Sequence, residues 1–214
     1  MKAISEASLE RSAHILEWAV KNIHQVSIPN PNLRKRLAGS SFTLAIDLFN
    51  CTLILGKESA QSGVCVLARS ILECYVRGFW LAYVADDSTI ERFSKNQSTK
   101  TLKPLIGAIK KSKSNSIPKN SLADLENKVH TLDSITHGGL AHMKLRNISD
   151  DKIGTNLSKQ NMTPLFILFG ASVVVNCVEQ FTRSLLEDEF RSIEQLDEGT
   201  DFLSQLLTTI KDNE

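Results

Sequence analysis

The chain has 214 residues, of which 42% are hydrophobic and 23% charged, and its formal net charge is +1. This length fits one globular domain, and the apolar fraction lies well above that of disordered chains. A net charge near zero gives the whole chain no electrostatic preference for nucleic acid or for membrane surfaces. We therefore expect a soluble, cytoplasmic protein that folds as a single domain over residues 1–214.

The N-terminal segment MKAISEASLERSAH contains two acids and no apolar core, so we expect no signal peptide. Four cysteines occur singly within apolar runs, and no pair has the CxxC spacing of zinc ribbons or redox motifs. These residues are Cys51, Cys65, Cys74 and Cys177. We expect buried, reduced thiols, no metal site and no cofactor.

Apolar residues recur at spacings of three and four along most of the chain, a pattern that predicts α-helices. The first helix is expected over residues 5–26, because the cluster Pro29-Asn30-Pro31 ends it. A second long helix is expected over 33–56 and a third over about 60–85. A polar, lysine-rich stretch follows over 86–120, with a modest helical piece near 102–109.

Further helices are expected in the second half of the chain. Ser121 and Asp124 resemble a capping box that opens a helix running into His137. After a polar loop over 149–161, Thr163 as N-cap and Pro164 predict a helix that reaches about residue 186. An acidic helix over 190–212 follows. Because alternating β-branched runs are missing, we predict an all-α, antiparallel helical bundle with long central helices and a core within residues 33–186.

Two apolar stretches approach the length of a membrane span. Residues 64–84 are interrupted by Arg69, Glu73 and Arg77, and residues 164–178 are shorter than the roughly 20 residues that a span requires. We therefore expect both stretches to be central helices of the bundle, and no membrane partner.

The three charges in the third predicted helix follow each other at intervals of four residues, so they share one face. Two interpretations remain open. Arg69, Glu73 and Arg77 form either an intrahelical ladder of ion pairs or a polar site, in which Arg69 and Arg77 bind an anionic ligand.

The segment THGGLAHMKLRN contains a second group of candidate residues, namely His137, His142 and Arg146. An imidazole beside an arginine suits proton transfer and phosphate stabilisation. The two histidines lie five residues apart, which does not match the HExxH zinc motif. The alternative is that each histidine is an ordinary surface or core residue.

One polar row interrupts the helix expected after Pro164. It consists of Ser172, Asn176, Gln180 and Arg183. Such a row inside a bundle hydrogen-bonds a neighbouring helix. Alternatively, it completes a ligand site with Arg69 and Glu73, in which Asn176 binds the ligand. In the second predicted helix, Asp47 and Asn50 are likewise polar exceptions.

Positive charge is concentrated in residues 92–122, which contain eight Lys and Arg residues, among them Lys110 and Lys111, and no acid. Such a segment suits contacts with RNA phosphates, although Phe93, its one aromatic residue, offers little base stacking. The alternative is compensation by the nine acids that follow Ser184, within one chain or across a dimer.

The segment ARSILE over residues 68–73, followed by THGG over 136–139, resembles HEPN-like helical bacterial proteins, and most closely the uncharacterised and abortive-infection-related branches. The resemblance covers roughly residues 40–185. Many such proteins are dimeric, metal-independent ribonucleases of toxin–antitoxin or antiphage systems, and others are non-catalytic binding modules. In the active branch an Arg is followed after four to six residues by His, and none of the nine arginines here shows that spacing.

The resemblance implies two hypotheses. In the first, His137 or His142 moves the proton of a ribose 2′-OH, Arg69 and Arg146 steady the phosphate, and Glu73 orients Arg69. In the second, the chain is a non-catalytic helical module that dimerises and binds a protein partner or a small ligand. Both hypotheses imply a homodimer, and the first adds an antitoxin or another defence-system protein as a partner.

Overall fold

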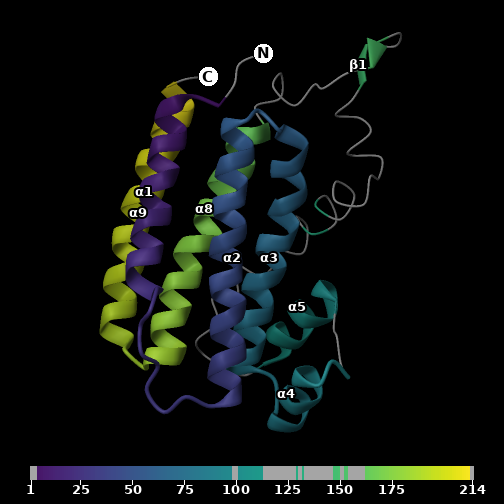
Figure 1. Cartoon of the computed structure of the whole chain (residues 1–214), viewed down its shortest axis with the longest axis vertical. Coiled ribbons are helices and arrows are strands. Elements are labelled where there is room, and N and C mark those ends of the chain that lie inside the picture. The colour runs from purple at the N-terminus through teal and green to yellow at the C-terminus, as the bar shows by residue number, and fades with distance from the viewer. Residues whose placement is uncertain are drawn as a thin grey trace.

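A computed structural model describes residues 4–97, 101–112, 129, 132, 147–149, 152–153 and 162–212. Most of these residues are helical, and the helices pack around one hydrophobic core (Figure 1). The chain is an all-α helical bundle, as the periodicity of its apolar residues predicts.

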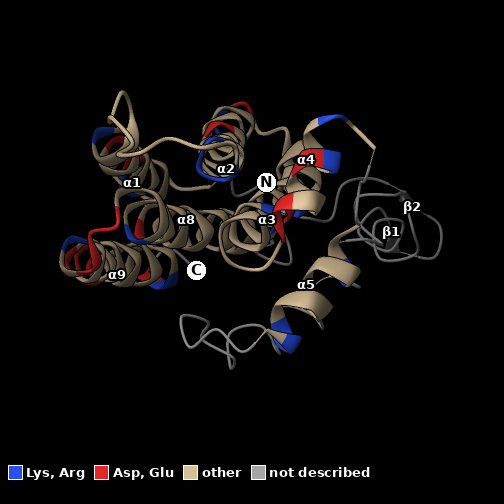
Figure 2. Cartoon of the chain, turned by 90° about the horizontal axis from the view of Figure 1, so that it is seen from below, with Lys and Arg blue, Asp and Glu red and all other residues tan. Residues whose placement is uncertain are grey.

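Five long helices in the described part of the chain form the bundle. They are α1 (Glu6–Ile23), α2 (Leu33–Lys57), α3 (Gln61–Tyr83), α8 (Met162–Phe181) and α9 (Glu189–Asp212). The helices α2, α3 and α8 lie in the middle, and α1 and α9 lie side by side against one side of α8 (Figures 1 and 2). α2 is antiparallel to both α3 and α8, so α3 and α8 run in the same direction (Figure 1).

Two short helices, α4 (Asp87–Ser94) and α5 (Leu102–Lys111), lie on the other side of the bundle, beside α3 (Figure 2). α5 confirms the predicted helical piece, whereas α4 falls in a stretch that we expected to be a polar connection. It forms because the Asp86 carboxylate accepts a hydrogen bond from the backbone N–H of Thr89 at 2.7 Å, and because Ile90 is buried.

The structure also differs from the expected pattern in three other places. A short antiparallel pair, β1 (Asn147–Ser149) and β2 (Lys152–Ile153), occupies part of the expected polar loop. α8 begins at Met162, which puts Thr163 inside the helix rather than at its N-cap. α8 ends in a π-helical turn, η1 (Thr182–Leu186). The helix expected to begin at Ser121 is only partly described. Its residues Val129 and Leu132 are helical and buried, as predicted, and its other residues lie outside the described ones.

Glycines allow α2 to lie very close to both of its neighbours. A Cβ at Gly78 of α3 would lie 2.6 Å from the ring of Phe42, and a Cβ at Gly170 of α8 would lie 2.7 Å from the ring of Phe49. Both phenylalanines belong to α2 and are fully buried, so these rings have little room to move. The centre of the bundle therefore depends on two positions without a side chain.

By length and composition, two helices in the described part of the chain would be able to cross a membrane, Leu33–Lys57 and Thr163–Leu186. The most apolar window of the second helix is 72% buried, as expected for a central helix of a bundle, whereas that of α2 is only 44% buried. Cys51, on the outer side of α2, is accordingly exposed, so the expectation that all four thiols are buried was wrong.

Replacement of Gly78 by Ala is expected to destabilise the protein by about 1–3 kcal/mol, because the new methyl group overlaps the buried Phe42 ring. Gly107 in α5 provides a matched control, since a Cβ there meets nothing within 4 Å. Gly107→Ala is expected to stabilise α5 by up to about 1 kcal/mol through helix propensity. Urea unfolding measures both changes, and equal effects would contradict the close approach of α2 and α3.

Candidate functional site

Arg69, Glu73 and Arg77 form a continuous ladder along α3. Nη1 of Arg69 lies 2.9 Å from Oε2 of Glu73, and Nη2 of Arg77 lies 2.5 Å from Oε1 of the same carboxylate. The side chains of Arg69, Glu73 and Arg77 are 11%, 33% and 19% exposed, respectively. The ladder that the spacing predicts is therefore present, and it lies mostly out of solvent.

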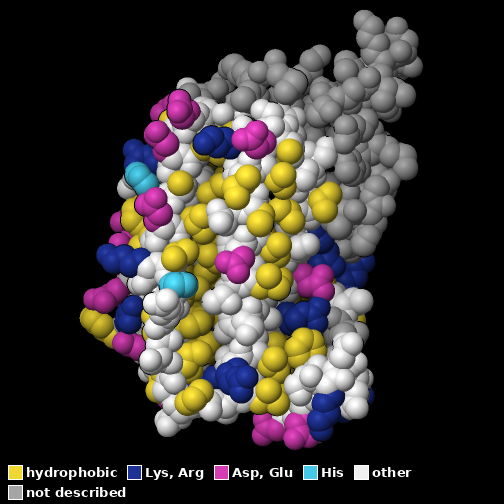
Figure 3. Space-filling model, viewed as in Figure 1, with side chains coloured by type: hydrophobic (Ala, Val, Ile, Leu, Met, Phe, Trp, Pro, Cys, Tyr) yellow, Lys and Arg dark blue, Asp and Glu magenta, His cyan; other side chains and the backbone are white. Residues whose placement is uncertain are grey.

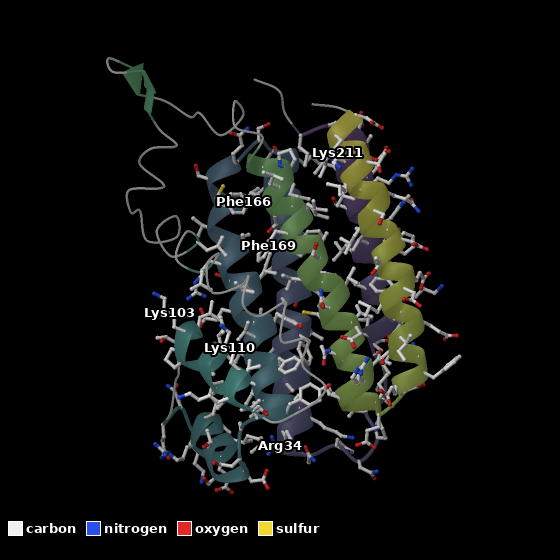
Figure 4. All side chains as sticks on the ribbon, turned by 180° about the vertical axis from the view of Figure 1, so that it is seen from behind. Arg34, Lys103, Lys110, Phe166, Phe169 and Lys211 are labelled. Carbon is white, nitrogen blue, oxygen red and sulfur yellow. The ribbon has the colours of Figure 1, made fainter. Side chains whose placement is uncertain are left out.

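The ladder is joined to the short helices beside it. The guanidinium carbon of Arg77 lies 5.6 Å from the centre of the Phe93 ring, which belongs to α4. This distance fits a cation–π contact. α5 packs against α3, and Lys103 and Lys110 project from α5 (Figure 4). Two guanidiniums share one carboxylate in the ladder, and α5, the short helix next to it, carries lysines and no acid.

The predicted histidine partners of the ladder lie outside the described residues, as does Arg146. The proximity of His137 or His142 to Arg69 therefore stays a prediction. Among the other candidate ligand-binding residues, Lys110 and Lys111 occupy the last turn of α5 and are exposed. Their positive charges interact favourably with the partial negative charge at the C-terminal end of the helix dipole.

A second polar cluster lies where α3 and α8 end side by side. Tyr83 of α3 donates a hydrogen bond from Oη to Oε1 of Gln180 at 2.8 Å, and Gln180 donates through Nε2 to Glu179. Oε1 of Glu179 also lies 2.8 Å from Nε of Arg183, which forms an ion pair. The Glu179 side chain is only 6% exposed, so this carboxylate is a nearly buried one.

The polar row predicted on α8 is only partly used as expected. Gln180 reaches the neighbouring helix through Tyr83. Ser172 donates instead to the backbone carbonyl of Leu168, and Asn176 donates to that of Ser172, so both side chains bond within their own helix. The expectation that these two residues connect neighbouring helices was wrong, because a serine or an asparagine in a helix readily bonds the carbonyl one turn earlier.

Glu179 and Tyr83 belong to this cluster and were missed by the sequence analysis. The available signal was Glu179 itself, the first charge in an otherwise uncharged helix, followed by Arg183 four residues later. Tyr83 carries no comparable signal, because its contact depends on α3 and α8 running in the same direction.

Burial controls the protonation of the groups between α3 and α8. It raises the pKa of Cys74 to about 11 and the pKa of Tyr83 to about 12, and it raises the pKa of Cys177 well above its ordinary value. These groups are therefore protonated at neutral pH, and the two thiols lack the thiolate form that a nucleophile requires. Burial also raises the pKa of Glu179, while Arg183 and Gln180 partly offset the shift.

Replacement of Glu179 by Gln is expected to change how stability depends on pH. Because burial raises the pKa of Glu179 in the folded protein, its stabilising contribution is complete below the ordinary pKa of 4.5 and is lost as the pH rises through the folded value. The free energy of unfolding of the wild type should therefore fall relative to the variant as the pH rises from about 4.5 towards neutrality.

Urea unfolding at a series of pH values measures this difference. The control is Glu189→Gln, because Glu189 pairs with the same arginine but is 77% exposed. This variant removes an exposed partner of the same arginine and leaves the buried carboxylate in place. A Glu179→Gln curve parallel to that of the wild type would contradict the buried carboxylate.

Removal of the shared carboxylate by Glu73→Ala is expected to destabilise the protein by about 1–3 kcal/mol. This lies between the effects of breaking exposed and fully buried ion pairs, and it arises because two largely buried guanidiniums lose their common partner. Glu91→Ala is the control, since the Glu91–Lys95 pair is 4.0 Å long and exposed, and the change should cost less than about 0.5 kcal/mol. Equal urea midpoints for the two variants would contradict a stabilising ladder.

The chain matches the model of a family of unknown function, DUF6988, over residues 42–173, which is more than half of its length. The chain belongs to the DUF6988 family. The matched range contains the α3 ladder, α4 and α5, and it ends before Glu179, so the ladder lies within the DUF6988 region and most of the second cluster lies outside it.

No curated protein and no solved structure matches the chain. Within the described residues, no group of three or more His, Cys, Asp or Glu side chains is placed to hold a metal ion. The described residues of the candidate site are two arginines, their shared carboxylate and the lysines of α5.

Proposed function

We propose that this protein is a HEPN-like bacterial defence or toxin-type protein that binds RNA phosphates on the face formed by α3, α4 and α5. The observation that carries the proposal is the positive charge of α5, which packs against α3, the helix of the ladder. α4 is mixed in charge, because it contains Asp87 and Glu91 as well as Arg92. Residues 92–97 and 101–112 contain five cations and no acid. These cations are Arg92, Lys95, Lys103, Lys110 and Lys111.

The way the short helices are held supports binding at this face. α5 buries Leu102, Leu105, Ile106 and Ile109, so its lysines are presented by a packed helix rather than by a loose segment. α4 is held by the contact between Phe93 and Arg77 of α3 and by the ion pair between Asp87 and Arg34 of α2 at 2.7 Å. The backbone that carries these lysines is already ordered, so binding a phosphate backbone orders only their side chains.

Cleavage of the bound RNA would require a proton carrier, for which the sequence offers His137 and His142. A positively charged ladder beside such a histidine would stabilise the phosphate in the transition state. In this version of the proposal Arg69 and Arg146 contact the phosphate, and Glu73 acts as a positioning residue for Arg69. The protein would then be a metal-independent ribonuclease of a toxin–antitoxin or antiphage system, opposed by an antitoxin.

The second candidate function is a non-catalytic module that binds a protein partner or a small ligand. It is favoured by the hydrogen bonds of the Glu73 carboxylate, each oxygen of which accepts a hydrogen bond from one arginine. Such a ladder stabilises a helix without a ligand. A non-catalytic function also agrees with the sequence, which lacks the Arg–His spacing found in the active HEPN branch.

Binding of a short, fluorescein-labelled oligouridylate, followed by fluorescence anisotropy, tests the proposal. The double variant Lys103→Gln/Lys111→Gln is expected to weaken binding by about tenfold and to lower the salt dependence, log Kd against log salt, by about 0.7 for each lost phosphate contact. The matched control, Lys21→Gln/Lys211→Gln, removes the same charge from α1 and α9 and should leave both quantities unchanged.

The same mixtures on a denaturing gel, with EDTA present, separate binding from cleavage. Shortened RNA that disappears in His137→Ala supports the ribonuclease, and intact bound RNA supports a binding protein. Absence of RNA binding by the wild type, or equal weakening in the two double variants, would overturn the proposal.

A further inference from the structure

The helix α2 is more apolar than its burial explains. Its most apolar window has a mean hydropathy of 1.4, yet only 44% of that window is buried. Leu33 and Leu44, at the start and near the middle of the helix, are 38% and 49% exposed. Figure 3 shows hydrophobic side chains along this face of the molecule. Several exposed apolar side chains on one helix face mark a candidate interaction site.

The residues on this face are arranged symmetrically about Leu44. Intervals of four, seven and eleven residues on either side of Leu44 correspond to about one, two and three helical turns, so one stripe runs along the helix. We call it the α2 stripe. It consists of Leu33, Leu37, Ser40, Leu44, Leu48, Cys51 and Leu55, all of which are exposed or partly exposed.

We propose that the α2 stripe is the contact surface of a homodimer, in which the α2 helices of two copies pack antiparallel about a two-fold axis at Leu44. Such an interface is isologous, so a surface must be complementary to itself. The axis places Leu44 against Leu44 of the partner subunit and Leu37 against Cys51 of the partner subunit. Leu33 then lies against Leu55 of the partner subunit, and Leu48 lies against Ser40 of the partner subunit, so four of the five leucines of the stripe have an apolar partner.

Two opposite charges beside the α2 stripe, Arg36 and Asp47, are placed to pair between two copies of the chain. Arg36 and Asp47 lie on the same edge of α2, and a two-fold axis keeps that edge on the same side of the dimer. Arg36 of one copy then lies about 7.5 Å along the helix axis from Asp47 of the partner subunit, at 1.5 Å per residue. An arginine side chain spans this distance. A lipid bilayer would instead bury Asp47 without a cation, which is costly.

Site-specific cross-linking tests this register. With oxidised glutathione as the oxidant, Leu44→Cys in a Cys51→Ser background is expected to give disulfide-linked dimers on a non-reducing gel. Leu37→Cys is expected to cross-link only while Cys51 is present. The wild type should not cross-link through Cys51, because the two copies of that residue lie about 21 Å apart along the axis. Leu165→Cys in the Cys51→Ser background is the control, since Leu165 is 48% exposed but lies on α8.

Sedimentation equilibrium gives an independent readout that does not involve RNA, so it distinguishes failure of this proposal from failure of the proposed function. The wild type is expected to be a dimer, Leu44→Glu a monomer with an unchanged circular dichroism spectrum, and Leu165→Glu a dimer. A monomeric wild type, including one that floats with phosphatidylcholine–phosphatidylglycerol vesicles, would overturn the proposal. Equal cross-linking of the Leu44→Cys and Leu165→Cys variants would also overturn it.

Discussion

The central constraint on this fold is that α3, a central helix of a hydrophobic bundle, carries three charges that are mostly out of solvent. An unpaired guanidinium or carboxylate is costly in such a place. The chain meets this requirement within α3 itself, because Glu73 lies one turn from Arg69 and one turn from Arg77 and pairs with both. Phe93 of α4 then covers Arg77. This contact and the ion pair between Asp87 of α4 and Arg34 of α2 together hold α4 against the bundle.

The apolar surfaces of α8 and α2 are buried to different extents because the two helices have different neighbours. α8 is covered by α1, α2, α3 and α9, so its apolar composition is matched by its burial. α2 reaches the core through phenylalanine rings that fill the space left by two glycines, and its opposite side has no helix over it among the described elements. The proposed functions follow this division, with phosphates at the cationic side of α3 and a second copy at the apolar side of α2.

The sequence predicts most of the helices and the α3 ladder, because both depend on spacing along one helix. An interval of four residues is sufficient to place Glu73 beside both arginines. α4 was missed because its one buried residue, Ile90, and its cap at Asp86 give a weak local pattern. The π-helical turn at the end of α8 likewise has no signature in the sequence.

Contacts between helices were not predictable from spacing alone. The hydrogen bond from Tyr83 to Gln180 requires α3 and α8 to end side by side. The spacing of residues within either helix does not determine how the two helices are placed relative to each other. The exposure of Cys51 similarly depends on which side of α2 faces its neighbours, since α2 is apolar on several sides. The spacing of apolar residues along one helix predicts neither the Tyr83–Gln180 hydrogen bond nor the exposure of Cys51.

Lysine footprinting with acetic anhydride, in the presence and absence of a short oligouridylate, tests most directly whether the cationic side of α3, α4 and α5 is the functional face. If this is the functional face, RNA shields Lys103 and Lys111 on α5 and leaves Lys21 on α1 and Lys211 on α9 fully reactive. Equal shielding of all four lysines, or shielding confined to α1 and α9, would contradict it.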